Sequence, residues 1–307
     1  MTYVWLIVGF ILLIKGADYF VEGSSSVAKI LRVPSVIIGL TVVAFGTSAP
    51  EAAVSITAAL EGSNGIAVGN VIGSNIFNLL VVIGLGSIIK PIAAERKIMY
   101  GDFIYSIGIS LVLLILIVHD HECGRGDGLL MLALFGYFMY ATVKSALKNR
   151  VSVQEETMAL TPLRSSVCIV LGLTAIIMGG NLVVDSAAEI AEMFGLSEDL
   201  IGLTIVAVGT SLPELVTSVV AAYKGENGLA LGNVVGSNIF NVLMVLAISS
   251  AIKPIAVSTQ TVYDLICLII CSGAAWILTR TSMKVSRGEG VVMVGMYIGY
   301  MAYIIAR

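Results

Sequence analysis

Apolar residues fill the chain in runs of about twenty, separated by polar, glycine or proline residues. Cutting at these breaks gives ten apolar segments, at 3–30, 34–60, 65–88, 100–118, 127–147, 163–192, 198–223, 228–251, 259–279 and 289–306. A helix of about 20 apolar residues crosses the roughly 30 Å hydrocarbon core of a bilayer. The segments are too long, and alternate too little, for the strands of a membrane β-barrel. The pattern therefore predicts an all-α fold with ten transmembrane helices.

Composition agrees with this pattern. Of 307 residues, 58% are hydrophobic and only 12% are charged, and mean hydropathy is +1.00, whereas soluble domains are about 25% charged. We expect an integral membrane protein in a lipid bilayer, with no nucleic-acid partner. No Lys or Arg precedes Lys15 and no convincing cleavage site follows, so the first segment is interpreted as a span rather than a signal peptide.

The distribution of basic residues predicts the orientation in the membrane. If the N-terminus is extracellular, thirteen Lys and Arg fall in inner loops or at inner span ends, and only Arg125, Lys253 and Arg307 fall outside. Inner loops of membrane proteins carry the excess of Lys and Arg. We therefore expect a multi-pass protein of the cell membrane with both termini extracellular.

The two halves of the chain repeat each other at an offset of 163 residues. "IGLTVVAFGTSAPE" at 38–51 matches "IGLTIVAVGTSLPE" at 201–214, and "GNVIGSNIFN" at 69–78 matches "GNVVGSNIFN" at 232–241. Between 38–92 and 201–255, 34 of 55 positions are identical without a gap. Repeated sequence at a fixed period indicates repeated structural units.

Five spans separate each element from its copy, so the copies cross the membrane in opposite directions. Inverted-topology repeats are typical of secondary transporters, whose sites lie near the bilayer midplane between the repeats. We predict a first five-helix repeat at 1–147, a short cytoplasmic linker at 148–162 and an inverted second repeat at 163–307.

Glu51 and its copy Glu214 lie near the middle of apolar spans. A charged side chain there costs about 2.5–3.5 kcal/mol even on the insertion scale, so it needs a compensating partner. Pro50 and Pro213 precede them. Because proline lacks the N–H that would bond the carbonyl four residues back, each helix should kink and expose backbone oxygens.

Oxygen-bearing residues share a helical face with the two glutamates, or with each other in the next span. These are Thr47, Ser48, Ser74, Asn78, Thr210, Ser211, Ser237 and Asn241, together with the backbone of Ala44 and Ala207. Hydroxyl, amide, carbonyl and carboxylate oxygens suit Ca²⁺, Na⁺ or Mg²⁺. The sequence thus predicts a cation site.

Other polar residues have simpler interpretations. Asn70, Asn75, Asn233 and Asn238 are as well explained by hydrogen bonds between helices. Lys15, Asp18 and Glu22 are spaced for an ion pair within the first helix, although Glu22 matches Asp185 and could line the ion path. "HDHECGRGDG" at 119–128 is interpreted as a solvated outer loop without a counterpart in the second half.

The two "GTSxPE…GSNIFN" blocks resemble the alpha repeats of the Ca²⁺/cation antiporter superfamily, in particular the sodium/calcium exchangers. The resemblance covers essentially the whole chain. It implies ten helices, with Glu51 and Glu214 as central ligands shared by Ca²⁺ and Na⁺. It also implies that the residues named above complete four clustered cation positions, and that the first and sixth spans slide against the rest.

One departure from the superfamily concerns charge. The potassium-dependent branch carries Asp where this chain has Asn78 or Asn241. The site therefore keeps two formal negative charges, and we expect exchange that needs Na⁺ but not K⁺.

The predicted function is antiport of Na⁺ against Ca²⁺ by alternating access, with both ions as substrates, no cofactor and a monomer as the working unit. A proton-driven calcium antiporter and a passive cation channel are the alternatives. A hydrolase is the weakest interpretation because no H-E-x-x-H or G-x-S-x-G motif occurs.

Overall fold

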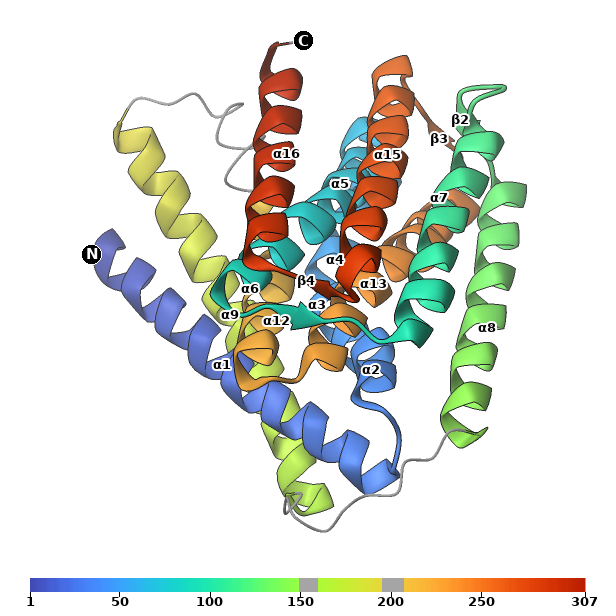
Figure 1. The fold of residues 1–307 in the computed structure, drawn as a ribbon. Coiled ribbons are helices and arrows are strands. Elements are labelled where there is room, and N and C mark those ends of the chain that lie inside the picture. The colour runs from blue at the N-terminus through green and yellow to red at the C-terminus, as the bar shows by residue number, and fades with distance from the viewer. Residues whose placement is uncertain (149–159, 195–206, 307) are drawn as a thin grey trace.

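A computed structural model describes residues 1–148, 160–194 and 207–306. The described chain is helical, with two short β-ribbons (Figure 1). Within those ranges, eight helices are long and apolar enough to cross a membrane, and a bent helix pair makes a ninth. The expected seventh span, 198–223, begins outside the described residues.

The elements of the first half follow one another closely along the chain. They are α1 (Thr2–Leu31), α2 (Ser35–Ile38), η1 (Gly39–Val43), α3 (Ala44–Thr47), α4 (Ala49–Glu61), α5 (Asn64–Phe77), η2 (Asn78–Val82), α6 (Ile83–Ile89), β1 (Ile92–Ala93), η3 (Ile98–Asp102), α7 (Phe103–Ile117), β2 (Glu122–Cys123) and α8 (Arg125–Lys148). The η elements are π-helical stretches, which often mark functional sites.

The second half repeats this order of elements where it is described, except that α15 begins without a π-helical stretch equivalent to η3. They are α9 (Pro162–Met193), α11 (Ala207–Gly209), α12 (Leu212–Lys224), α13 (Asn227–Phe240), η5 (Asn241–Leu246), α14 (Ala247–Ile252), β3 (Ile255–Ala256), α15 (Thr259–Ser282), β4 (Lys284–Val285) and α16 (Arg287–Ala306). Most of the predicted linker, residues 149–159, lies outside the described residues.

The span that carries Glu51 is broken, as its proline predicts. Ser35–Thr47 and Ala49–Glu61 meet at Ser48 with a bend of 50°. Proline is tolerated in the first turn of a helix, where an N–H has no partner to lose. Pro50 accordingly lies at the start of α4, and Pro213 occupies the equivalent place in α12.

Two antiparallel ribbons connect the halves of the chain. β1 pairs with β4, and β2 pairs with β3. Helix α15 runs from β3 to β4, so the two ribbons lie at opposite ends of that helix (Figure 1). Each ribbon thus joins one strand of the first half to one strand of the second.

Helices α1 and α9 pack tightly along their length. Gly16 and Gly172 lie at their interface, where an added Cβ on Gly172 would come within 2.6 Å of the Phe20 nitrogen and 2.7 Å of the Gly16 carbonyl oxygen. Small residues permit such close backbone approach between membrane helices. Figure 1 shows this pair to one side of the remaining helices.

Two predictions about charged segments were wrong. Asp18 pairs with Lys224, 2.5 Å away, rather than with Lys15 of its own helix. The motif at 125–128 does have a counterpart, because Arg125-Gly-Asp-Gly and Arg287-Gly-Glu-Gly begin α8 and α16 alike. Arg125 donates to the Ile252 carbonyl at 3.3 Å, and Arg287 donates to the equivalent Ile89 carbonyl at 3.4 Å.

Candidate cation site

The two glutamates lie in the first turns of α4 and α12, directly after the breaks in their helices. Both side chains are 0% exposed. Negative charge is favoured at a helix N-terminus because the peptide dipoles and free N–H groups point toward it. That effect offsets only part of the cost of burying two carboxylates.

Each carboxylate is bound by the serine of the opposite half. Ser48 donates to Glu214 Oε1 at 2.8 Å, and Ser211 donates to Glu51 Oε1 at 3.0 Å. The serines of the following spans join them, since Ser237 donates to Glu214 Oε1 at 3.4 Å and Ser211 contacts Ser74 at 3.1 Å. Six of the predicted ligands therefore lie together at the interface of the halves.

Four asparagines form a reciprocal clasp where α5 meets η2 and where α13 meets η5. Asn75 donates to the Asn238 carbonyl at 3.2 Å, and Asn238 donates to the Asn75 carbonyl at 3.1 Å. A carbonyl can only accept, so these bonds fix the amide nitrogens and leave the amide oxygens as acceptors. Asn78 then donates to Asn238 Oδ1 at 3.2 Å, and Asn241 donates to Asn75 Oδ1 at 3.1 Å.

This clasp leaves the oxygens of Asn78 and Asn241 free. Asn78 Oδ1, Asn241 Oδ1, Glu51 Oε2 and Glu214 Oε2 are all buried without a hydrogen-bond partner. Buried polar atoms normally have partners, and an orphaned acceptor costs about 1–3 kcal/mol, more for a charged group. Each repeat contributes one carboxylate oxygen and one amide oxygen to this set of four. Such oxygens are suitable ligands for a hard cation.

The threonines and alanines are placed less centrally. Thr47 donates to Asn233 Oδ1 at 3.0 Å, and Thr210 lies 3.4 Å from Asn70 Oδ1. The Ala44 carbonyl already accepts the Ser48 N–H at 3.0 Å, although a carbonyl oxygen has a second lone pair. Ala207 begins α11.

Further polar contacts support the site: Asn70 and Asn233 form hydrogen bonds between helices, as interpreted from the sequence, and their partners Ser55 and Ser218 were not anticipated. Asn70 donates to Ser55 Oγ at 2.9 Å and to the Glu51 carbonyl at 3.3 Å, and Asn233 donates to Ser218 Oγ at 2.9 Å. Ser55 and Ser218 recur in both repeats, which is the signal that could have identified them. The unpartnered Thr217 hydroxyl lacks such a signal because Val54 holds the equivalent position.

Neither glutamate has a basic partner within the part of the chain that the structure describes. The one ion pair found there joins Lys224 to Asp18, and neither of these residues belongs to the site. Two buried carboxylates without Lys or Arg require bound cations or protons for neutrality.

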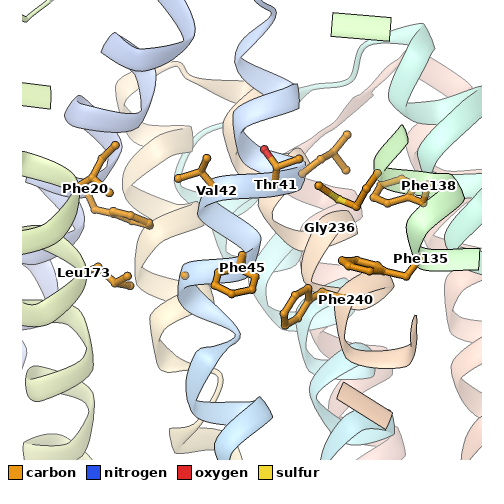
Figure 2. Close-up of a pocket in the computed structure, with 13 residues that line it drawn as sticks. Phe20, Thr41, Val42, Phe45, Phe135, Phe138, Leu173, Gly236 and Phe240 are labelled. Carbon is orange, nitrogen blue, oxygen red and sulfur yellow. The ribbon is translucent and has the colours of Figure 1, made fainter. Parts of the chain in front are cut away.

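An apolar cavity of about 410 Å³ lies beside the site. Figure 2 shows Phe45, Phe135 and Phe240 on one side of it and Phe20 with Leu173 on the other. Its threonine, Thr41, donates to the Ile37 carbonyl at 2.7 Å. The walls of the cavity therefore offer no ligand for a cation. The cavity lies between the α1–α9 pair and the helices that hold the site.

Comparison with known proteins assigns the family. The sequence model described as sodium/calcium exchanger protein matches residues 1–144 and 164–306. The chain belongs to the sodium/calcium exchanger family. As a member of that family it is a transporter rather than an enzyme.

Relatives of this exchanger family match over nearly their full lengths. The sodium/calcium exchanger MaX1 of Methanosarcina acetivorans is 32% identical over 345 residues, covering 99% of this chain and 98% of that protein. The inner membrane protein YrbG of Escherichia coli is 35% identical, covering 97% and 95%. A solved structure of the sodium-calcium exchanger NCX_Mj, soaked with zero Na⁺ and Ca²⁺, superposes with a TM-score of 0.87 at 32% identity, covering 99% and 98%.

Proposed function

We propose that this protein exchanges Na⁺ for Ca²⁺ across a cell membrane, and that both ions use the site at Glu51 and Glu214. The observation that carries the proposal is the pair of fully buried carboxylates whose Oε2 atoms have no partner. One Ca²⁺ matches their two negative charges, and Na⁺ ions can replace it at the same oxygens. The names of the relatives support this choice of ions.

The proposed ligand set has a centre and a periphery. Glu51 and Glu214 bind every transported ion, and the free oxygens of Asn78 and Asn241 complete the central position. The remaining ligands are the hydroxyls of Thr47, Ser48, Ser74, Thr210, Ser211 and Ser237 and the carbonyls of Ala44 and Ala207. Calcium takes six to eight oxygen ligands and tolerates irregular geometry, which suits a set of this size.

The proposed mechanism is alternating access. An exchanger must cross between its two open states readily when ions neutralise the site and poorly when the site is empty. Two uncompensated carboxylates meet that condition, because moving them unpaired through a closed, low-dielectric state costs several kcal/mol. The cavity beside α1 and α9 supports a movement of those two helices against the rest.

The proposed architecture is ten helices in two inverted repeats, 1–147 and 163–307, with a cytoplasmic linker at 148–162 and extracellular termini. Three features support the inversion: the crosswise serine bonds, the reciprocal asparagine clasp and the two ribbons at opposite ends of α15. Each is a pair of contacts that a two-fold axis in the membrane plane would interchange. We propose that a single chain is the working unit, since the site is built from one chain.

The test is uptake of ⁴⁵Ca²⁺ into proteoliposomes that contain the purified protein. An outward Na⁺ gradient should drive uptake, whereas an outward K⁺ gradient should not. Uptake driven by an outward H⁺ gradient alone would favour the proton-driven antiporter. Flux that depends on neither gradient would indicate a passive channel.

A further inference from the structure

One face of α1 contacts the turn between α12 and α13 through polar side chains. Lys224 Nζ lies 2.5 Å from Asp18 Oδ1 and donates to the Asp18 carbonyl at 3.0 Å. Two turns further along α1, Ser25 donates to Glu226 Oε1 at 2.5 Å. The side chains of Asp18 and Lys224 remain 40% and 30% exposed, so the pair lies at the surface of the protein rather than in its core.

Glu22 lies on the same face of α1 without a basic partner. It follows Asp18 by four residues, which places the two carboxylates one above the other, about 6 Å apart along the helix. Glu22 is exposed, and no ion pair involves it within the described residues. It is therefore the next carboxylate that Lys224 would meet if α1 moved by one turn.

We propose that Asp18 and Glu22 are alternate partners of Lys224, and that the pairing shifts from one to the other when α1 moves by one helical turn during transport. This inference rests on the proposed alternating access. It assigns Asp18, Glu22 and Lys224 as positioning residues, because none of them touches the ions. One known mode of such movement is a shift of one packed element past another by a whole turn, about 5.4 Å, after which equivalent contacts form again.

The charges on α1 set the direction of this step. Lys224 reaches Glu22 when α1 moves toward its own N-terminus. Movement by one turn in the opposite direction would bring Lys15, three residues before Asp18, against Lys224, and two ammonium groups repel each other. Phe20, two residues after Asp18 and therefore on the opposite side of α1, lines the apolar cavity, which leaves space for that side of the helix to move.

The contact is a feature of one half only. At the repeat offset, Asn181 replaces Asp18, Ala188 replaces Ser25, and Glu61 replaces Lys224. The repeated fold itself therefore does not require the ion pair, because the equivalent residues of the other half, Asn181 and Glu61, could not form one. The ion pair therefore stabilises one register of α1 in a way that α9 does not share.

Cross-linking tests the proposal independently of transport. With the four native cysteines replaced, Asp18→Cys/Lys224→Cys and Glu22→Cys/Lys224→Cys are each oxidised in membranes containing Na⁺, Ca²⁺ or neither. Both pairs should form disulfides, in proportions that change with the ion. Lys15→Cys/Lys224→Cys is the matched control and should stay reduced, because the proposed movement of α1 carries position 15 away from position 224. Formation of the Asp18 pair alone under every condition would overturn the proposal.

Flux measurements provide the second readout. Glu22→Gln should lower the maximal rate of Na⁺-driven Ca²⁺ uptake about two- to fivefold and leave the KM for Ca²⁺ unchanged, because an exposed pair is worth little and lies outside the site. Glu22→Asp should restore the rate. An unchanged rate in Glu22→Gln would contradict the proposal. Absence of Na⁺-driven uptake in the wild type would instead refute the proposed function.

Discussion

At the scale of single residues, the orientation of two amide groups decides what the site offers to an ion. Asn78 and Asn241 turn their nitrogens toward Asn238 and Asn75 and keep their oxygens free. An asparagine whose amide could rotate would present a repelling NH₂ group as readily as an oxygen. The clasp therefore makes two neutral side chains serve as fixed oxygen ligands.

Removing either buried charge should abolish transport. Glu51→Gln and Glu214→Gln should each eliminate Na⁺-driven Ca²⁺ uptake, because one remaining carboxylate leaves a divalent ion undercompensated in a low dielectric. Glu61→Gln is the control, since Glu61 ends the same helix as Glu51 but is exposed. Uptake in proteoliposomes and the elution profile of each variant are measured. Wild-type exchange by a well-folded Glu51→Gln protein would refute the site assignment.

Wild-type exchange should need Na⁺ but not K⁺. A K⁺ ion taken up with Ca²⁺ would bring a third positive charge to a site with two carboxylates. Asn241→Asp supplies a third negative charge but removes the donor to Asn75 Oδ1, so its oxygen faces an acceptor. The variant should gain K⁺ stimulation at high pH, where the new carboxylate is ionised, and lose it at low pH, where a proton restores that bond.

The K⁺ prediction is measured as Ca²⁺ flux at a fixed Na⁺ gradient with K⁺ exchanged for choline. A large K⁺ requirement in the wild type would contradict this role of the asparagines, while the antiporter assignment would stand.

Most of the central residues could be predicted from the sequence, because the repeat presents each one twice and a buried Glu demands an explanation. Their contacts could not be predicted. Ser48 is 166 residues from Glu214, and Asn75 is 166 from Asn241, so those bonds depend on how the halves dock. The pairing of Asp18 was missed for the same reason. The sequence shows that Lys15 is close to Asp18 on one helix, but it does not show that Lys224 lies close to Asp18 in space.

At the scale of elements, local chemistry predicted the breaks but not the ribbons. Proline fixes its own φ and removes a donor wherever it lies, so the break near Pro50 follows from sequence alone. The ribbons have only two residues in each strand. The matching motifs at 125–128 and 287–290 are 162 residues apart, so a comparison at 163 residues passes over them.

A glycine in that motif should be essential for packing α8 against α14. A Cβ on Gly128 would come within 2.6 Å of the Ala247 carbonyl oxygen and 2.7 Å of the Ala251 nitrogen, whereas one on Gly126 would meet nothing within 4 Å. Gly128→Ala should therefore destabilise the protein by about 1–3 kcal/mol. Gly126→Ala, in the same helix, is the control. Thermal unfolding in detergent compares them, and equal midpoints would contradict the packing.

At the scale of the whole molecule, inversion predicts that equivalent loops face opposite sides of the membrane. Glu61→Cys and Tyr223→Cys place thiols at the ends of α4 and α12, where both native side chains are exposed. In a cysteine-free background, an impermeant maleimide applied to intact cells should label position 61 and should label position 223 only after permeabilisation. Labelling of both positions from one side would refute the inverted arrangement.

The ribbons have a consequence for biosynthesis. β1 pairs with a strand roughly 190 residues later, close to the end of the chain. During synthesis, the first half therefore emerges and enters the bilayer with the edge of β1 unsatisfied until α15 has crossed and β4 has appeared. A polypeptide released before that point would leave β1 without its partner strand, and an unpaired strand edge is a feature that quality-control proteases can recognise in a truncated product.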